Sequence, residues 1–168
     1  MPTYDETDIE LLTLKDAHDA IRKHAYMYAR SPREPIAEII KGITEGIESL
    51  GITEFCVKDT DKFICVEAKD DWLQPNEVFD SVEMAFKHLA PLKGHINSVR
   101  TEVYLKAFYF DFFTSGLSGL YGNGEIARQF YLENYSNYSE TGGRVLIVSK
   151  KRNLPKKHQI CFTAPDAQ

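Results

Sequence analysis

The sequence predicts an α+β fold, a two-layer sandwich in which helices pack on one face of a mixed, mostly antiparallel sheet. The first observation is a run of apolar residues at steps of three and four between Pro35 and Gly51, which is the period of an amphipathic helix. The second is a change to alternating apolar residues directly after Gly51, which is the period of a strand. The third is the order of the elements, with helices first and antiparallel strands later.

The most regular element is a helix predicted over residues 36–50. Its apolar side chains fall on one stripe: Ile36, Ile39, Ile40, Ile43, Ile47 and Leu50. A stripe of this kind faces a core, and Gly51 is a suitable residue to end the helix. A shorter helix is predicted over residues 14–28, and residues 31–35, with two prolines, form a loop between the two helices.

The middle of the chain predicts a β-hairpin, a loop and a further helix. The hairpin has strands around residues 55–57 and 63–66, with a turn at residues 59–61. A loop over 69–75 leads to a helix from Asn76 to Leu89, ended by Pro91 and Gly94, and residues 97–105 fit one or two further helical turns.

The last part of the chain predicts antiparallel strands. The aromatic run 108–113 favours a strand. Because glycine tolerates turn conformations, Gly122-Asn123-Gly124 is interpreted as a hairpin turn, with residues 125–132 as its return strand. Later strands are predicted at 144–149 and 159–163, separated by a basic turn over 150–157.

Composition narrows the classes of protein to consider. The 168 residues are expected to form a single domain, and the formal net charge of −5 argues against direct binding of nucleic acid. No stretch approaches the roughly 20 apolar residues that span a bilayer, and the N-terminus lacks a secretory signal pattern, so we expect no membrane partner. Three cysteines without metal-ligand spacing predict no zinc site and a reducing cytoplasm.

Several short segments resemble, in order, the ATPase domain of the DNA gyrase B subunit. Residues 19–28, Asp-Ala-Ile-Arg-Lys-His-Ala-Tyr-Met-Tyr, resemble its "(D/E)A(V/I)RKRPGMYIG" opening. The segments 122–131, 141–143 and 162–166 resemble its "(R/N)xGKxYxQxF", "TGT" and "FxPD" motifs. The resemblance implies a GHKL, or Bergerat, fold over residues 1–168 without the family's transducer domain. In this family ATP and magnesium lie between the helices and one face of the sheet.

The resemblance also assigns a vestigial nucleotide pocket. It places Lys41 at the position of the general base and Glu45 at that of the magnesium-binding asparagine. Asp70 and Asp71 stand at the adenine-binding aspartate. The phosphate lid is reduced to a turn that includes Lys93 and Gly94, and Gly143 replaces the threonine of "TGT". Since protonated lysine is no base and a short turn cannot surround three phosphates, we expect no cofactor and no catalysis.

Two surfaces are candidates for contact with a partner protein. One is the outward face of the aromatic strand, formed either by Phe108, Phe110 and Phe112 or by Tyr109, Asp111 and Phe113. The other is the tyrosine-rich stretch with Tyr131, Tyr135 and Tyr138, whose Tyr, Asn and Ser content is typical of protein-binding surfaces.

The sequence therefore suggests a non-catalytic, protein-binding relative of gyrase B. It would act as an immunity or antitoxin-like protein that neutralises a toxin, or as a modulator of gyrase or a topoisomerase, and homo-oligomers are possible. The alternative is an ATP-binding or ATP-hydrolysing GHKL protein with a rearranged site, using Glu38 or Glu45 as base. A weaker third possibility is a small-molecule sensor.

Overall fold

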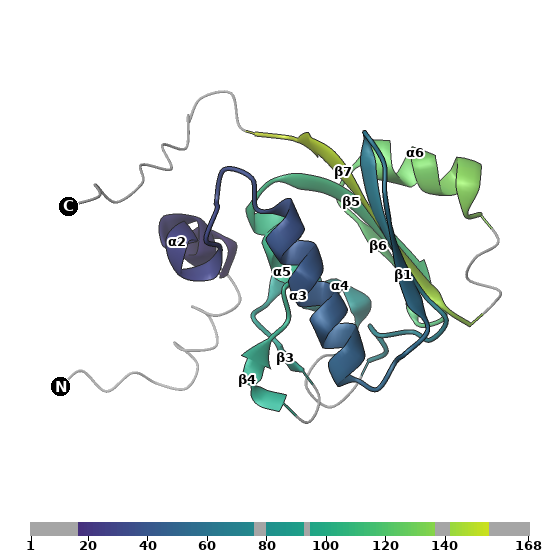
Figure 1. Cartoon of the computed structure of the whole chain (residues 1–168). Helices are drawn as coiled ribbons and strands as arrows, with labels where there is room; N and C mark the ends of the chain where they lie inside the picture. The colour runs from purple at the N-terminus through teal and green to yellow at the C-terminus, as the bar shows by residue number, and fades with distance from the viewer. Residues whose placement is uncertain (1–16, 76–79, 93–94, 137–141, 155–168) are drawn as a thin grey trace.

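The protein is built around a five-stranded antiparallel sheet with helices on both faces (Figure 1). The computed structural model describes residues 17–75, 80–92, 95–136 and 142–154. The strands follow the order β1-β2-β7-β5-β6: β1 (Phe55–Asp59), β2 (Phe63–Ala68), β7 (Arg144–Arg152), β5 (Phe110–Gly116) and β6 (Gly119–Gly122). Every neighbouring pair of the five is antiparallel, which corrects the expectation of a mixed sheet. Strand β7 lies at the centre, between the hairpins β1–β2 and β5–β6.

The helices are short apart from two. They are α2 (Ala25–Tyr28), α3 (Ile36–Ser49), α4 (Val82–Lys87), α5 (Glu102–Ala107) and α6 (Glu125–Asn134), and residues 17–23 are also helical. A small second sheet pairs β3 (Pro91–Leu92) with β4 (His95–Val99). The α+β class predicted from the sequence is thus confirmed.

Helix α3 forms the main core with one face of the sheet. The predicted helix over 36–50 is confirmed, and its Ile39, Ile40, Ile43 and Ile47 are buried. Each such side chain contributes about 1.5–3 kcal/mol by leaving water. The sheet side of this core includes Ile64, Val66, Phe112, Leu146 and Val148, and α4 adds Phe86, whose ring stacks on Phe112 with centroids 4.6 Å apart.

The opposite face of the sheet is covered by α6, which corrects the expected two-layer sandwich to three layers (Figure 1). Ala127 and Tyr131 of α6 pack with Phe113, Val145 and Ile147 of the sheet. As a result all seven residues of β5 are buried, so the aromatic strand has no uncovered face. The expectation that this strand offers a partner surface is wrong for that reason.

The prediction of a return strand over 125–132 is also wrong, because the hairpin turns earlier. Gly116 pairs with Gly119, so the turn is Leu117-Ser118 and the return strand is β6. Gly124 then leads into α6, where the Asp111 carboxylate accepts hydrogen bonds from the N–H groups of Ala127 at 2.8 Å and Ile126 at 3.3 Å. The glycine is needed for this close approach rather than for a turn, since a Cβ at Gly124 would lie 1.9 Å from Asp111 Oδ2.

The other predicted elements agree in part. The β1–β2 hairpin, the 69–75 loop and the strand over 144–149 are confirmed, and β7 continues through Arg152, where a turn was expected. The continuation is explained by Lys150 N–H, which donates to the carbonyl of Lys62 at 2.9 Å. Within 97–105 the structure has the end of β4 and the start of α5. The predicted strand 159–163 and the helix start at Asn76 lie outside the described residues.

Two glycines of α3 provide a matched test of helix packing. A Cβ at Gly42 would lie 2.6 Å from Thr101 Cγ2, and Thr101 is held by its hydroxyl, which donates to Ile39 O at 3.1 Å. A Cβ at Gly46 would meet only the Leu92 methyl groups, at 3.5 Å and beyond. We expect Gly42→Ala to lower the free energy of unfolding by about 1–2 kcal/mol because overpacking exceeds the gain in helix propensity.

Gly46→Ala should instead raise the free energy of unfolding, by up to about 1 kcal/mol, because alanine favours the helix and meets no clash. Urea unfolding of the two variants beside the parent measures both changes. Two changes of the same sign would contradict the packing of α3 against Thr101.

Candidate functional site

An ion pair buried at one end of the sheet is the most elaborate polar cluster among the described residues. Asp71 lies in the loop after β2, and Arg144 is the first residue of β7. Arg144 Nε donates to Asp71 Oδ1 at 2.5 Å and Nη2 donates to Oδ2 at 3.1 Å, with the side chains 0% and 7% exposed. This two-pronged geometry is the strong form of an Arg–carboxylate pair.

The β5–β6 hairpin completes the cluster. Arg144 also donates to Thr114 Oγ1 at 3.0 Å, Ser118 Oγ at 2.9 Å and Gly119 O at 3.0 Å. Asp71 Oδ2 accepts from both the N–H and the hydroxyl of Ser118. The cluster therefore fastens the loop, the start of β7 and the hairpin turn to one another.

The ionisation of Asp71 follows from these contacts. Burial alone would raise the pKa of Asp71, but the hydrogen bond and charge of Arg144, together with the Ser118 hydrogen bonds, outweigh it and hold the pKa below its ordinary value. The carboxylate stays charged at neutral pH, and its lone pairs are engaged within the protein. It has little capacity left to accept a hydrogen bond from a ligand such as an adenine amino group.

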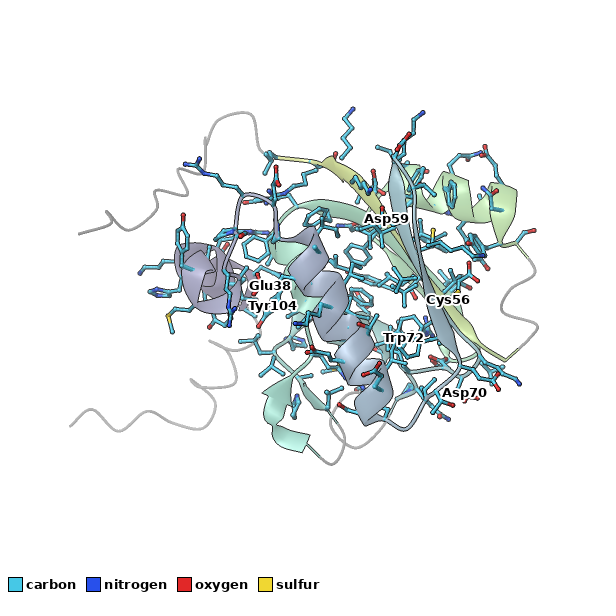
Figure 2. All side chains as sticks on the ribbon, viewed as in Figure 1. Glu38, Cys56, Asp59, Asp70, Trp72 and Tyr104 are labelled. Carbon is cyan, nitrogen blue, oxygen red and sulfur yellow. The ribbon has the colours of Figure 1, made fainter. Side chains whose placement is uncertain are left out.

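The other residues of the predicted pocket lie apart from this cluster. Lys41 and Glu45 form an ion pair of 3.8 Å along α3, with side chains 75% and 63% exposed, on the side of the helix away from the core. Asp70 is exposed beyond the end of β2, as Figure 2 shows, and Gly143 is buried next to Arg144. Lys93 and Gly94 lie outside the described residues. Of the predicted pocket residues, Asp71 thus lies near Gly143, because it pairs with the adjacent Arg144. Lys41 and Glu45 are exposed to water and do not join this cluster.

Trp72 shows how the adjacent space is filled. It is 2% exposed and lies between α3 and the sheet (Figure 2). Its indole N–H donates to Glu102 Oε1 at 3.3 Å, and Glu102 also pairs with Arg100 at 3.7 Å. Arg100 Nη1 also donates to Trp72 O at 3.3 Å, so the three buried residues are linked to one another within the core.

The tyrosine-rich stretch is less exposed than its composition suggests. Tyr131 is 6% exposed, and its hydroxyl lies 3.0 Å from Ser115 Oγ, so it supplies core rather than partner surface. Tyr135 is half-buried, and its hydroxyl donates to Glu67, which also pairs with Lys58 at 2.7 Å. Burial, and then the Glu67 hydrogen bond, raise the pKa of Tyr135. Tyr138 lies outside the described residues.

Sequence reasoning missed an exposed apolar surface on the β5–β6 hairpin. Leu117 in the turn is 73% exposed and Leu120 in β6 is 67% exposed. The signal available in the sequence was Ser115-Gly116-Leu117-Ser118-Gly119, two glycines flanking a two-residue turn. The sequence prediction placed the hairpin turn at the later glycine pair, Gly122 and Gly124, instead.

Comparison with known protein families, with curated proteins and with solved structures found no match. The resemblance to gyrase B is therefore carried by the sequence motifs alone. No helix within the described residues has the length and apolar character to cross a membrane. The same residues contain no group of three or more His, Cys, Asp or Glu side chains placed to hold a metal ion.

Proposed function

We propose that this protein acts by binding another protein and that it does not use ATP. Two forms of this function follow from the resemblance: an immunity or antitoxin-like protein that neutralises a toxin, and a modulator of gyrase or a topoisomerase. The proposal depends on one observation: buried side chains fill the space between the helices and the sheet. In the family that the sequence resembles, the nucleotide binds in this space.

That space is occupied by large side chains. Ile43 and Ile47 of α3, Phe86 of α4, Trp72 and Phe112 are each at most 2% exposed and belong to one packed core. Protein interiors are packed as tightly as organic crystals, so a nucleotide would have to displace several of these side chains. Truncating even one such side chain to alanine costs about 2–5 kcal/mol.

The chemistry of the predicted pocket also supports the proposal that the protein does not use ATP. The Asp71 carboxylate is paired with Arg144, and the side chains of Lys41 and Glu45 are exposed to water on α3. A nucleotide entering between α3 and the sheet would find neither an adenine acceptor nor a magnesium ligand from these residues. Function then rests on the outer surface, where the Leu117 and Leu120 side chains are exposed.

The first test is calorimetry of the full chain with ATP and magnesium. We expect no saturable binding with a dissociation constant below about 1 mM, which corresponds to roughly −4 kcal/mol, and no release of phosphate. The matched control is the separate titration of magnesium without nucleotide. Binding tighter than this value would refute the proposal and favour the alternative of a rearranged ATP site.

The second test concerns the partner. Gyrase subunits and the toxin candidates encoded beside this gene are each titrated with the protein, and at least one is expected to form a stoichiometric complex in the absence of nucleotide. A toxin partner would favour the immunity form, and a gyrase subunit the modulator form. Complex formation that depends on added ATP would contradict both.

A further inference from the structure

The two edges of the sheet differ in how they are protected from pairing with another strand. The edge strand β1 is lined by ion pairs: Lys58 with Glu67 at 2.7 Å, Lys150 with Asp59 at 2.5 Å and, just before it, Lys69 with Glu54 at 2.9 Å. Charges of this kind are the usual device against edge-to-edge association. The other edge strand, β6, has the sequence Gly-Leu-Tyr-Gly and carries no charge at all.

The register of β5 and β6 fixes which backbone groups of β6 face outward. Asn123 N–H donates to Phe112 O at 3.2 Å, so residues 112 and 123 form a hydrogen-bonded pair. Hydrogen-bonded and non-hydrogen-bonded pairs alternate in an antiparallel ladder. Tyr121, opposite Thr114, therefore bonds toward β5, whereas the N–H and C=O groups of Leu120 and Gly122 point away from the sheet.

These outward groups are accessible along an apolar strip. Leu120 is 67% exposed, Gly119 and Gly122 are exposed, and Leu117 extends the strip at 73% exposure. The hairpin that presents them is held by Arg144 through Ser118 and Gly119 O. An incoming strand would thus meet a template that is already ordered, which lowers the entropic cost of binding.

Charge selects the kind of strand that fits. Tyr121 faces the helical side of β6, where Lys106 Nζ lies 3.5 Å from its hydroxyl and Lys87 is a further charged neighbour. Lys87 pairs with Glu83 at 2.5 Å, and no described carboxylate lies within ion-pair distance of Lys106. This corner therefore holds two lysines against one glutamate, in a protein whose formal net charge is −5.

We infer that β6 accepts an extended segment of a partner protein as a sixth strand of the sheet. Its acidic side chains would lie beside Lys106 and Lys87, and its apolar side chains beside Leu120. Main-chain hydrogen bonds to Leu120 and Gly122 supply affinity, and the alternating side chains supply specificity. The inference rests on the proposed protein-binding function and specifies its surface and its ligand.

The test uses two acetylated eight-residue peptides, one alternating valine with glutamate and one alternating valine with lysine. We expect the glutamate peptide to bind saturably below 1 mM and the lysine peptide at least tenfold more weakly. NMR of the bound protein should show the amides of Leu120 and Gly122 protected from exchange by the peptide, while protection of the Tyr121 amide, which already bonds β5, does not change.

Two variants with a matched control complete the test. Leu120→Asp is expected to weaken binding of the glutamate peptide at least tenfold, since it removes the apolar contact and places a charge of the same sign on the edge. Leu132→Asp changes another exposed leucine, on α6, and should leave binding within twofold. Lys106→Gln should narrow the difference between the two peptides.

Several results would overturn the inference: no saturable binding of either peptide at millimolar concentration, protection on β1 instead of β6, or an unchanged affinity in Leu120→Asp. Self-association of the protein that protects Leu120 and Gly122 without peptide would assign the edge to a second copy. A native partner that binds Leu120→Asp normally would remove this surface and leave the proposed function standing. Tight binding of ATP and magnesium would remove the function itself.

Discussion

Arg144→Met is expected to lower the free energy of unfolding by about 3–5 kcal/mol, because it leaves the Asp71 carboxylate charged, buried and without its counterion. Methionine fills much of the space of the arginine stem, so the loss is mainly electrostatic. The same change removes the donor to Gly119 O and one of the partners of the Ser118 hydroxyl. Chemical denaturation at neutral pH measures the loss.

The control is Asp71→Asn in the Arg144→Met background. The amide removes the unpaired charge, and its one oxygen keeps an acceptor for the Ser118 N–H, whereas the Leu73 N–H loses its acceptor. We therefore expect the double variant to recover about half of the lost stability. A double variant as unstable as Arg144→Met would show that the buried charge is not the cause.

The pH dependence of this difference has a definite sign. The pKa of Asp71 is lowered in the folded protein, so its ion pair contributes stability at any pH above the unfolded value, about 3.9, and loses it as the pH falls through the folded pKa. In Arg144→Met, burial without a partner favours the protonated carboxyl. The gap between the two proteins should therefore be largest at neutral pH and shrink below about pH 4. A gap that widens in acid would contradict the assignment.

Gly124→Ala is the second substitution with a large expected effect. Its backbone is extended, with φ −154° and ψ 161°, a conformation that alanine adopts freely. The new methyl group would nevertheless overlap Asp111, which is 2% exposed and holds the first turn of α6. We expect a loss of about 2–4 kcal/mol from the displaced carboxylate and its two hydrogen bonds to the helix, measured by thermal and urea unfolding.

A double-mutant cycle separates the clash from any general effect of alanine. Asp111→Ala alone should cost about 2 kcal/mol, because two N–H groups at the start of α6 lose their acceptor. Gly124→Ala added to Asp111→Ala should then cost less than about 1 kcal/mol, because the carboxylate atoms that the methyl group would overlap are gone. Simple additivity of the two losses would contradict the role assigned to Asp111.

The sequence was most informative where local periodicity and burial agree. The stripe of α3 predicted both the helix and its buried face, and the alternation after Gly51 predicted the β1–β2 hairpin. Helix α6 was mistaken for a strand because two glycines resembled a turn, although Ala127, Phe130 and Tyr131 are spaced as on one helical face. Steps of three and four residues are the period of a helix and do not fit a strand.

The polar cluster was beyond local reasoning. Asp71 and Arg144 are 73 residues apart, and neither carries a neighbouring residue that marks it for burial. The resemblance to gyrase B drew attention to Asp71 as an adenine ligand, whereas its partner is a side chain of the same protein. Likewise, Tyr131 and Tyr135 look alike in the sequence, and only the packing of α6 on the sheet makes one of them core.

The central position of β7 bears on how the chain is synthesised. Both strands that flank it precede it in the sequence, so β1–β2 and β5–β6 leave the ribosome as two separate hairpins, each with an inner edge of unpaired backbone. The sheet closes only when residues 144–152 emerge and fill the gap. Until then β2 and β5 of the nascent chain expose unpaired backbone N–H and C=O groups, and such edges can pair with other chains or be bound by chaperones. Synthesis of β7 is thus the step that allows the two separate hairpins to join into one sheet.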